Sequence, residues 1–266
     1  MITDFIFDGR TLSSFGYILI FENEEDTINV SNISFVEIKG ARNDRSYRAG
    51  YKYENNYSAT YTIIKNPCDN SDDLDMSDED ISELTRWLCR KQYKWFSFID
   101  PDNNQVWYKG YFTVQKKEIG DSLVGLSITF NTNAPYGFSG EIISTYLCND
   151  DNDRQFQLMI NSDEEGYIYP DIEIKLLEGG AFRLRNATED RTTVLLNCKE
   201  GEIIKLYGYD LQQIESDNED HDYIYDFNYK FPRLHNLYTI NENIWECSLN
   251  CEITFKYREI RKVGLK

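Results

Sequence analysis

Apolar and polar residues alternate over several short segments of the N-terminal half. In residues 57–64 and 126–130, almost every second side chain is apolar. Because successive side chains of a strand point to opposite faces, this period predicts half-buried β-strands. Shorter apolar runs occupy residues 5–7, 17–21 and 33–38. We expect the first two runs to pair as a hairpin and the third to be another half-buried strand.

One segment of this half has the helical period instead. Ile81, Leu84 and Leu88 recur at spacings of three and four residues, with Trp87 beside them. This stripe predicts an α-helix over residues 78–92 whose apolar face packs against a sheet.

Residues 94–130 read as a meander of three strands, with turns at "DPDNNQ" and "GD". The alternation then stops in the stretch "NTNAPYGFSG", which contains Pro135 and Gly137. Proline and glycine in a polar stretch typically end a strand. We therefore expect a β-rich domain with one α-helix over residues 1–140 and a second domain over residues 141–266.

Short alternating segments also fill the second half, and turns separate them at intervals of about ten residues. The expected strands cover residues 172–176, 182–186, 193–197, 202–207 and 246–260. This spacing is typical of an antiparallel β-sandwich, and no helix is evident. The acidic segment of residues 215–222 is interpreted as a solvated loop.

Composition supports a mainly β protein and restricts its partners. Aromatic residues make up 15% of the chain, and the formal net charge is −18. Aromatic side chains pack well on pleated sheets, whereas a strongly negative protein repels the phosphates of nucleic acids. The chain has no apolar run of about 18 residues and no basic start followed by an apolar segment. We expect neither a specific nucleic-acid partner nor a membrane partner.

The six cysteines raise the question of a metal site. The only close pair is Cys247 and Cys251, and the sequence has no second pair or histidine near it. We therefore expect reduced, structural thiols, with no metal and no cofactor.

An acidic segment has the ligand spacing of an EF-hand calcium loop. Its candidate ligands are Asp69, Ser71, Asp73, Asp75, Ser77 and Asp80. However, Leu74 stands where the loop requires glycine, and Asp80 replaces the bidentate glutamate. Helix capping by Ser77, followed by acidic residues in the first helical turn, explains the segment better, and calcium binding is the alternative.

Few residues could support catalysis. The chain has two histidines, His221 and His235, of which the first lies in the acidic segment 215–222. A Ser/His/Asp or Cys/His arrangement would have to use His235, and the sequence contains no nucleophile-elbow, Walker or glycine-rich phosphate-binding motif. We predict that the chain is not an enzyme and has no catalytic residues.

Sugar binding is a stronger alternative than catalysis. The segment from residue 233 to residue 246 has the residue types of a galectin site, namely Arg233, His235, Asn236, Trp245 and Glu246. It lacks the galectin order His-x-Asn-Pro-Arg, because Arg233 precedes His235 and no proline lies between them. Arg233, His235 and Trp245 are retained as possible sugar contacts, although for Trp245 a core position is the favoured interpretation.

Taken in order, these segments resemble the distal tail proteins of phages with long, flexible tails. In the first half, the similar stretches are "FIFDGRTLSSFGY", "IKGARND", "ISELTRWLCRKQYKWFSFIDPDNNQVWYKGYF" and "ITFNTNAPYGF". In the second half, "YPDIEI", "FRLRNAT", "GEIIKL" and "KFPRLHN" resemble the galectin-like domain of longer family members. The resemblance covers nearly the whole chain, and the order of the motifs is its specific feature.

The resemblance implies a ring-forming belt domain over residues 1–140 and a galectin-like β-sandwich over residues 141–266. The expected protein is a structural component of the virion tail tip, encoded by a phage or prophage and made in the cytoplasm of the bacterial host. Its ring, usually a hexamer and in some cases stacked, would join the tail tube protein to the tail-associated hub or lysin protein. The second domain would dock receptor-binding or baseplate proteins. The alternative is a carbohydrate-binding module that recognises host surface glycans.

Overall fold

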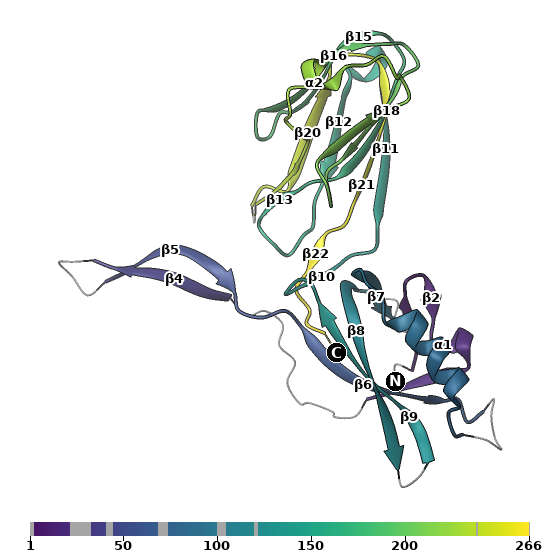
Figure 1. The fold of residues 1–266 in the computed structure, drawn as a ribbon. Helices are drawn as coiled ribbons and strands as arrows, with labels where there is room; N and C mark the ends of the chain where they lie inside the picture. The colour runs from purple at the N-terminus through teal and green to yellow at the C-terminus, as the bar shows by residue number, and fades with distance from the viewer. Residues whose placement is uncertain are drawn as a thin grey trace. The chain divides into compact units, whose positions relative to one another are not determined.

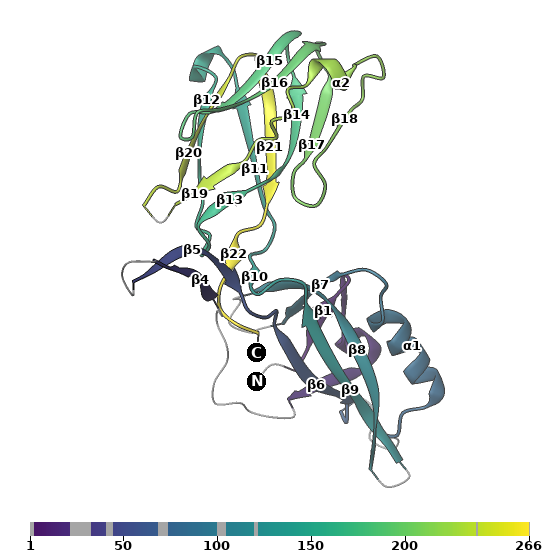
Figure 2. The same cartoon turned by 60° about the vertical axis from the view of Figure 1, so that its left-hand side comes forward.

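The structure is a computed structural model that describes residues 3–21, 33–40, 45–68, 74–99, 105–119, 122–237 and 239–265. It divides the chain into two compact units: residues 1–138 with 261–266 form unit 1, and residues 139–260 form unit 2. Both units are mainly β and antiparallel, as predicted (Figures 1 and 2). Among the described residues, no helix has the length and apolar character needed to cross a membrane.

An antiparallel sheet forms the centre of unit 1. The elements of unit 1 are β1 (Phe5–Phe7), β2 (Arg10–Thr11), a 3-10 turn (Ser13–Phe15), β3 (Tyr17–Phe21), β4 (Ile33–Lys39), β5 (Ser46–Tyr53), β6 (Ser58–Lys65), α1 (Asp78–Leu88), β7 (Lys94–Phe98), β8 (Trp107–Ile119), β9 (Ser122–Thr132) and β10 (Gly137–Phe138). The main path through the sheet is β2-β1-β7-β8-β9-β6-β3, and β10 pairs with β8. The predicted meander is confirmed as β7, β8 and β9, which are consecutive neighbours.

Helix α1 confirms the predicted helix, although it ends at Leu88 rather than at residue 92. Leu84, Trp87 and Leu88 are buried in the core of unit 1, and Ile81 packs against that core. The Trp87 ring stacks on Phe5, with ring centroids 5.6 Å apart. The apolar stripe of the helix therefore faces core side chains, as its period predicted.

The expected hairpin between residues 5–7 and 17–21 is wrong. Strand β1 pairs with β2 and β7, whereas β3 pairs with β6. The turn after β1 consists of Asp8 and Gly9, whose φ values are 50° and 76°. Asp-Gly favours a tight two-residue hairpin turn because both positions need a positive φ. This turn brings Arg10 opposite Phe7 and reverses the chain before β3 is reached.

Gly137 helps to explain why the alternating pattern of residues 126–130 stops in the stretch that follows. A Cβ atom at this position would lie 2.4 Å from Val106 Cγ1 and 2.9 Å from a ring carbon of Tyr108. Only a residue without a side chain allows the backbone to approach β8 so closely. The stretch thus contains the end of β9 and the short strand β10, which pairs with β8 and with β22 (Ile260–Arg261).

The last residues of the chain belong to unit 1, whereas the sequence-based boundary placed all of residues 141–266 in the second domain. Leu265 is only 7% exposed and is part of the unit 1 core. The hydroxyl of Tyr108 donates a hydrogen bond to the carbonyl oxygen of Gly264. The sequence signal for this return is weak, because a single apolar residue near a chain end has no periodicity.

Leu265→Ala is expected to lower the free energy of unfolding of unit 1 by about 2 kcal/mol, because it removes buried methyl groups from the core. Val263→Ala is the matched control, since Val263 is 51% exposed, and its effect should stay within about 0.5 kcal/mol. Urea unfolding followed by tryptophan fluorescence measures both variants. Equal stabilities of the two variants would contradict the packing of the last residues in this core.

The capping role predicted for Ser77 is confirmed. The Asp80 amide donates to Ser77 Oγ over 3.2 Å, and the Ser77 amide donates to Asp80 Oδ2 over 2.8 Å. Lys65 Nζ lies 3.2 Å from the same carboxylate oxygen. Burial raises the pKa of Asp80, but hydrogen bonds from Ser77, Tyr17 and Lys65 outweigh this effect and lower the pKa to about 2.

Asp80→Ala should therefore lower the free energy of unfolding by about 1 kcal/mol at neutral pH. Since the pKa is lower in the folded state, this stabilisation is complete above the ordinary carboxyl pKa of 3.8 and is lost as pH falls towards 2. Asp78→Asn is the control, because the Asp78 side chain is 97% exposed. Urea unfolding at several pH values tests the prediction, and a pH-independent effect of Asp80→Ala would contradict it.

Unit 2 is a β-sandwich. Its elements are β11 (Ile142–Cys148), a 3-10 turn (Asp150–Asn152), β12 (Gln155–Met159), β13 (Gly166–Ile168), β14 (Asp171–Leu176), β15 (Gly180–Asn186), β16 (Arg191–Cys198), β17 (Ile203–Tyr207), β18 (Gln213–Ser216), α2 (Tyr223–Asp226), β19 (Leu234–Asn236), β20 (Glu242–Cys247), β21 (Cys251–Tyr257) and β22 (Ile260–Arg261), whose last residue is in unit 1. One sheet has the order β11-β21-β14-β17-β18 and the other β12-β20-β15-β16. The strands of both sheets are labelled in Figure 2. Side chains from both sheets form a single core.

Two details of unit 2 differ from the sequence prediction. The segment 246–260 is not one strand, because β20 and β21 belong to different sheets and residues 248–250 connect them. The unit also contains the one-turn helix α2, which begins after Asp222, whose carboxylate accepts a hydrogen bond from the Ile224 amide. A helix this short leaves no periodic signal in the sequence.

Candidate assembly surfaces

Strands β4 and β5 form a separate two-stranded sheet within unit 1 (Figure 1). They pair with each other from Ile33 opposite Tyr53 to Lys39 opposite Ser46. The predicted strand at residues 33–38 is therefore present, but the expectation that it is half-buried is wrong. Phe35 is 58% exposed and Ile38 is 62% exposed. Alternation predicts a strand but does not show which element, if any, covers its apolar side chains.

Both faces of this hairpin expose apolar side chains. Because side chains alternate along a strand, Phe35 points to one face of β4, and Val36 and Ile38 point to the other. Tyr47 and Tyr51 of β5 are also about half exposed. An isolated two-stranded hairpin is only marginally stable in water, and clustered exposed apolar side chains typically mark an interaction surface. The apolar side chains exposed on its two faces therefore make the hairpin a candidate interaction surface on both sides.

The hairpin is basic, although the whole chain carries a net charge of −18. Its described residues include Lys39, Arg45, Arg48 and Lys52, against Glu37 and Glu54. The Arg48 guanidinium lies 5.8 Å from the centroid of the Phe35 ring, so charge and apolar surface occur together. Charge complementarity selects partners by favouring opposite signs. A strongly acidic partner, such as another copy of this chain, fits the hairpin.

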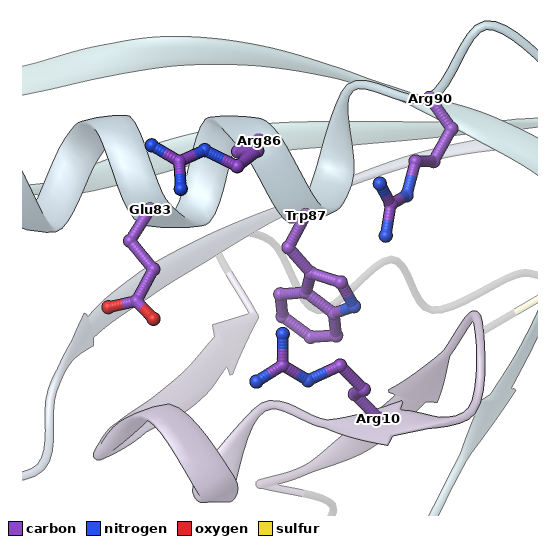
Figure 3. A pocket seen from close by; sticks show the side chains of 5 residues that line it. All are labelled: Arg10, Glu83, Arg86, Trp87 and Arg90. Carbon is purple, nitrogen blue, oxygen red and sulfur yellow. The ribbon is translucent and has the colours of Figure 1, made fainter.

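A second positive surface lies beside α1. A pocket of about 120 Å³ is lined by Arg10, Glu83, Arg86, Trp87 and Arg90 (Figure 3). Trp87 forms its floor and donates from Nε1 to the carbonyl oxygen of Phe7 over 3.0 Å. Three guanidinium groups and one carboxylate line the pocket, and Arg90 also pairs with Asp8 over 3.1 Å. The remaining positive charge favours an acidic group.

The three possible sugar contacts do not form one site. Trp245 is 1% exposed and packs in the core against Phe255, with ring centroids 5.3 Å apart. A sugar contact at Trp245 would need an exposed ring face, so the burial of this ring agrees with the core position that was the favoured interpretation. Residue type alone does not distinguish an inward-facing from an outward-facing tryptophan.

Arg233 and His235 do lie together, and both pack against the ring of Tyr167, which lies outside the galectin-like segment of residues 233–246. The Arg233 guanidinium lies 3.5 Å from the centroid of the Tyr167 ring, and His235 stacks on the same ring at 5.5 Å. Arg233 also pairs with Glu189 over 2.8 Å, and this carboxylate raises the pKa of the guanidinium. Tyr167 is 49% exposed. A sugar contact at Arg233 and His235 stays a prediction. In such a site, the Tyr167 ring would stack on the sugar.

The other candidate ligands are the residues of the EF-hand-like segment and the cysteines. Asp69, Ser71 and Asp73 of the EF-hand-like segment lie outside the described residues, while Ser77 and Asp80 cap α1. All six cysteines have free thiols. The Sγ atoms of Cys148, Cys247 and Cys251 lie within 4.8 Å of one another in the core of unit 2. The sequence spacing predicted only the nearness of the last two.

Comparison with solved structures identifies a similar fold. The crystal structure of the Dit protein of phage SPP1 matches at 10% sequence identity with a TM-score of 0.66, covering 97% of this chain and 99% of that one. The Dit protein is described as a paradigm of the hub adsorption apparatus in phages that infect Gram-positive bacteria. At this identity, the similarity shows the fold alone.

Comparison by sequence identifies the family. None of the curated proteins compared with the chain matches it. Residues 1–134 match a family described as the phage tail protein N-terminal domain, and residues 136–257 match one described as the phage tail C-terminal domain. The chain therefore belongs to this family of phage tail proteins and is a structural component of the virion tail with a Dit-like fold.

Proposed function

We propose that this phage tail protein assembles into a ring of six copies at the tip of the tail tube. The observation that carries the proposal is the exposed, basic and apolar hairpin of β4 and β5, which another copy of this acidic chain would cover. In a ring, the hairpin of each copy would pack on one neighbour, and the hairpin of the other neighbour would pack on that copy. Such head-to-tail contacts form a closed ring when the rotation between copies closes. The fold of the SPP1 hub protein supports a place of this kind in the tail.

In this proposal, unit 1 is the belt, and its other contacts are with the tail tube protein and the tail-associated hub or lysin protein. The pocket with Arg10, Arg86 and Arg90 supplies a positive contact for an acidic group of such a neighbour. Unit 2 would project as the docking domain for receptor-binding or baseplate proteins. A β-sandwich presents exposed strand edges and loops, which suit such docking without catalysis.

Negative-stain microscopy of the purified full-length chain tests the assembly. We expect closed rings with a central opening at micromolar concentration. Particles that stay at the size of one copy at the highest concentration examined would contradict the proposal.

A glycan-binding function of unit 2 is the second candidate, supported by the cluster of Tyr167, Arg233 and His235. An aromatic face beside charged and polar groups is a common way to hold a sugar ring. The chain should then bind host glycans on an array, and Tyr167→Ala should remove the signal while Tyr225→Ala, at an 82% exposed tyrosine elsewhere on unit 2, retains it. No signal on a broad array, or equal signals from the two variants, would contradict this function.

A further inference from the structure

His221 is buried, which the sequence did not predict. It lies in the acidic segment 215–222 that was interpreted as a solvated loop, yet its side chain is 0% exposed. The segment begins in β18 and ends before α2, and it places the imidazole beside Cys198, the last residue of β16. The Cys198 Sγ, a carboxylate oxygen of Glu202 and a ring nitrogen of His221 all lie within 4.8 Å of one another.

Glu202 fixes the imidazole rather than competing for an ion. Its Oε1 atom lies 2.6 Å from Nδ1 of His221 and accepts hydrogen bonds from the Ser216 and Tyr223 hydroxyls. Its Oε2 atom accepts from the Lys199 amide over 2.9 Å. Glu202 is therefore well supplied with hydrogen-bond donors, and it holds the Nδ1 proton of His221. A carboxylate at Nδ1 leaves the lone pair of a neutral imidazole on Nε2, the arrangement found behind metal-bound histidines.

Nε2 of His221 is buried and has no hydrogen-bond partner. The nearest carboxylate oxygen, Oδ2 of Asp226, lies 3.7 Å away, beyond hydrogen-bond distance. Two ligands at zinc distances in tetrahedral geometry lie roughly 3.3 Å apart. The separation is thus closer to that of two ligands of one ion than to that of a hydrogen bond. A buried nitrogen without a partner is otherwise costly.

We propose that unit 2 binds one transition-metal ion of the zinc class through Cys198 Sγ, His221 Nε2 and the carboxylate of Asp226, with Glu202 orienting the imidazole. Thiolate, imidazole and carboxylate are the ligand types that Zn²⁺ takes, and three protein ligands leave one position for water. The ion would join the end of β16 to α2 and to the segment after β18. It would therefore stabilise a part of unit 2 that contains little regular structure.

Zinc binds the thiolate form of cysteine, so binding at Cys198 would release the thiol proton to solvent. The alternative is an imidazolium that bridges Glu202 and Asp226 without any metal. The irregular spacing of residues 198, 202, 221 and 226 matches no sequence motif, which is why the sequence showed no metal site.

The test uses the full-length chain, stripped with a chelator and titrated with ZnCl₂ by calorimetry and with CoCl₂ by absorption. We expect one ion per chain and a thiolate-to-cobalt charge-transfer band. Cys198→Ser should abolish this band and weaken Zn²⁺ binding at least tenfold, whereas Cys89→Ser, at an exposed cysteine of unit 1, should change neither. Glu202→Gln should weaken binding by about 10- to 100-fold while the band persists.

Three outcomes would overturn the proposal. The stripped wild-type chain could fail to bind either ion, as the imidazolium alternative requires. Binding could survive Cys198→Ser and disappear in Cys247→Ser, which would place the ion at the cluster of Cys148, Cys247 and Cys251. Binding could also persist unchanged in both Cys198→Ser and His221→Gln. Circular dichroism of each variant verifies that unit 2 is folded when its affinity is measured.

Discussion

The double substitution Phe35→Glu, Ile38→Glu is expected to convert the proposed ring into single copies without unfolding them. The two side chains are 58% and 62% exposed and point to opposite faces of the hairpin, so the isolated chain loses little core packing. In the proposed ring, a neighbouring copy would cover both faces, and each new carboxylate would be buried without a partner. Burying an unpaired charge costs several kcal/mol. Two such costs weaken each contact by more than about a thousandfold.

Sedimentation velocity measures this change directly. The control is Ile224→Glu, which places the same charge on an apolar residue of unit 2 that is 72% exposed. The control variant should sediment like the wild-type ring, and the double variant should sediment as one copy with an unchanged circular dichroism spectrum. A ring that persists in the double variant would show that the hairpin is not the assembly contact.

Trp87→Ala should destabilise unit 1 by about 3–5 kcal/mol. Trp87 is 2% exposed, and its ring stacks on Phe5 and on Phe15, with centroids 5.6 Å and 4.5 Å away. The substitution removes these contacts and the hydrogen bond from Nε1 to the Phe7 carbonyl. It also removes the floor of the arginine-lined pocket. We expect the melting temperature of unit 1 to fall by roughly 10 °C.

Differential scanning calorimetry resolves this effect if the two units melt separately. Ser82→Ala is the matched control on the same helix, because Ser82 is exposed, and its melting temperature should stay close to that of the wild type. The transition of unit 2 should not move in either variant. A fall of the unit 1 transition by only a few degrees in Trp87→Ala would contradict a central packing role for this ring.

Periodic segments were predictable from the sequence because burial of one face is encoded in the spacing of apolar residues. The stripe of Ile81, Leu84 and Leu88 gave the helix, and the alternation of residues 126–130 gave β9. The connections were harder. The Asp8-Gly9 turn is a strong local signal for a hairpin. The sequence prediction nevertheless paired residues 5–7 with residues 17–21, because that apolar run is longer.

Features that depend on contacts between distant residues were not predictable in this way. Phe35 and Ile38 have the same period as a buried strand, and only the three-dimensional structure shows that no third strand pairs with β4 in the described residues. In the sequence, His221 lies within an acidic segment that is typical of a solvated loop. In the fold, it is buried beside Glu202 and Asp226. Residue type suggested Trp245 as a sugar contact, whereas its position in β20 turns the ring into the core.

Native mass spectrometry of the purified wild-type chain tests self-assembly through unit 1. A ring of six copies should give a dominant species at six times the chain mass of 31.4 kDa, and Phe35→Glu, Ile38→Glu should convert this species to the mass of a single chain. A wild-type spectrum that shows only the 31.4 kDa species at every concentration examined would contradict self-assembly through unit 1.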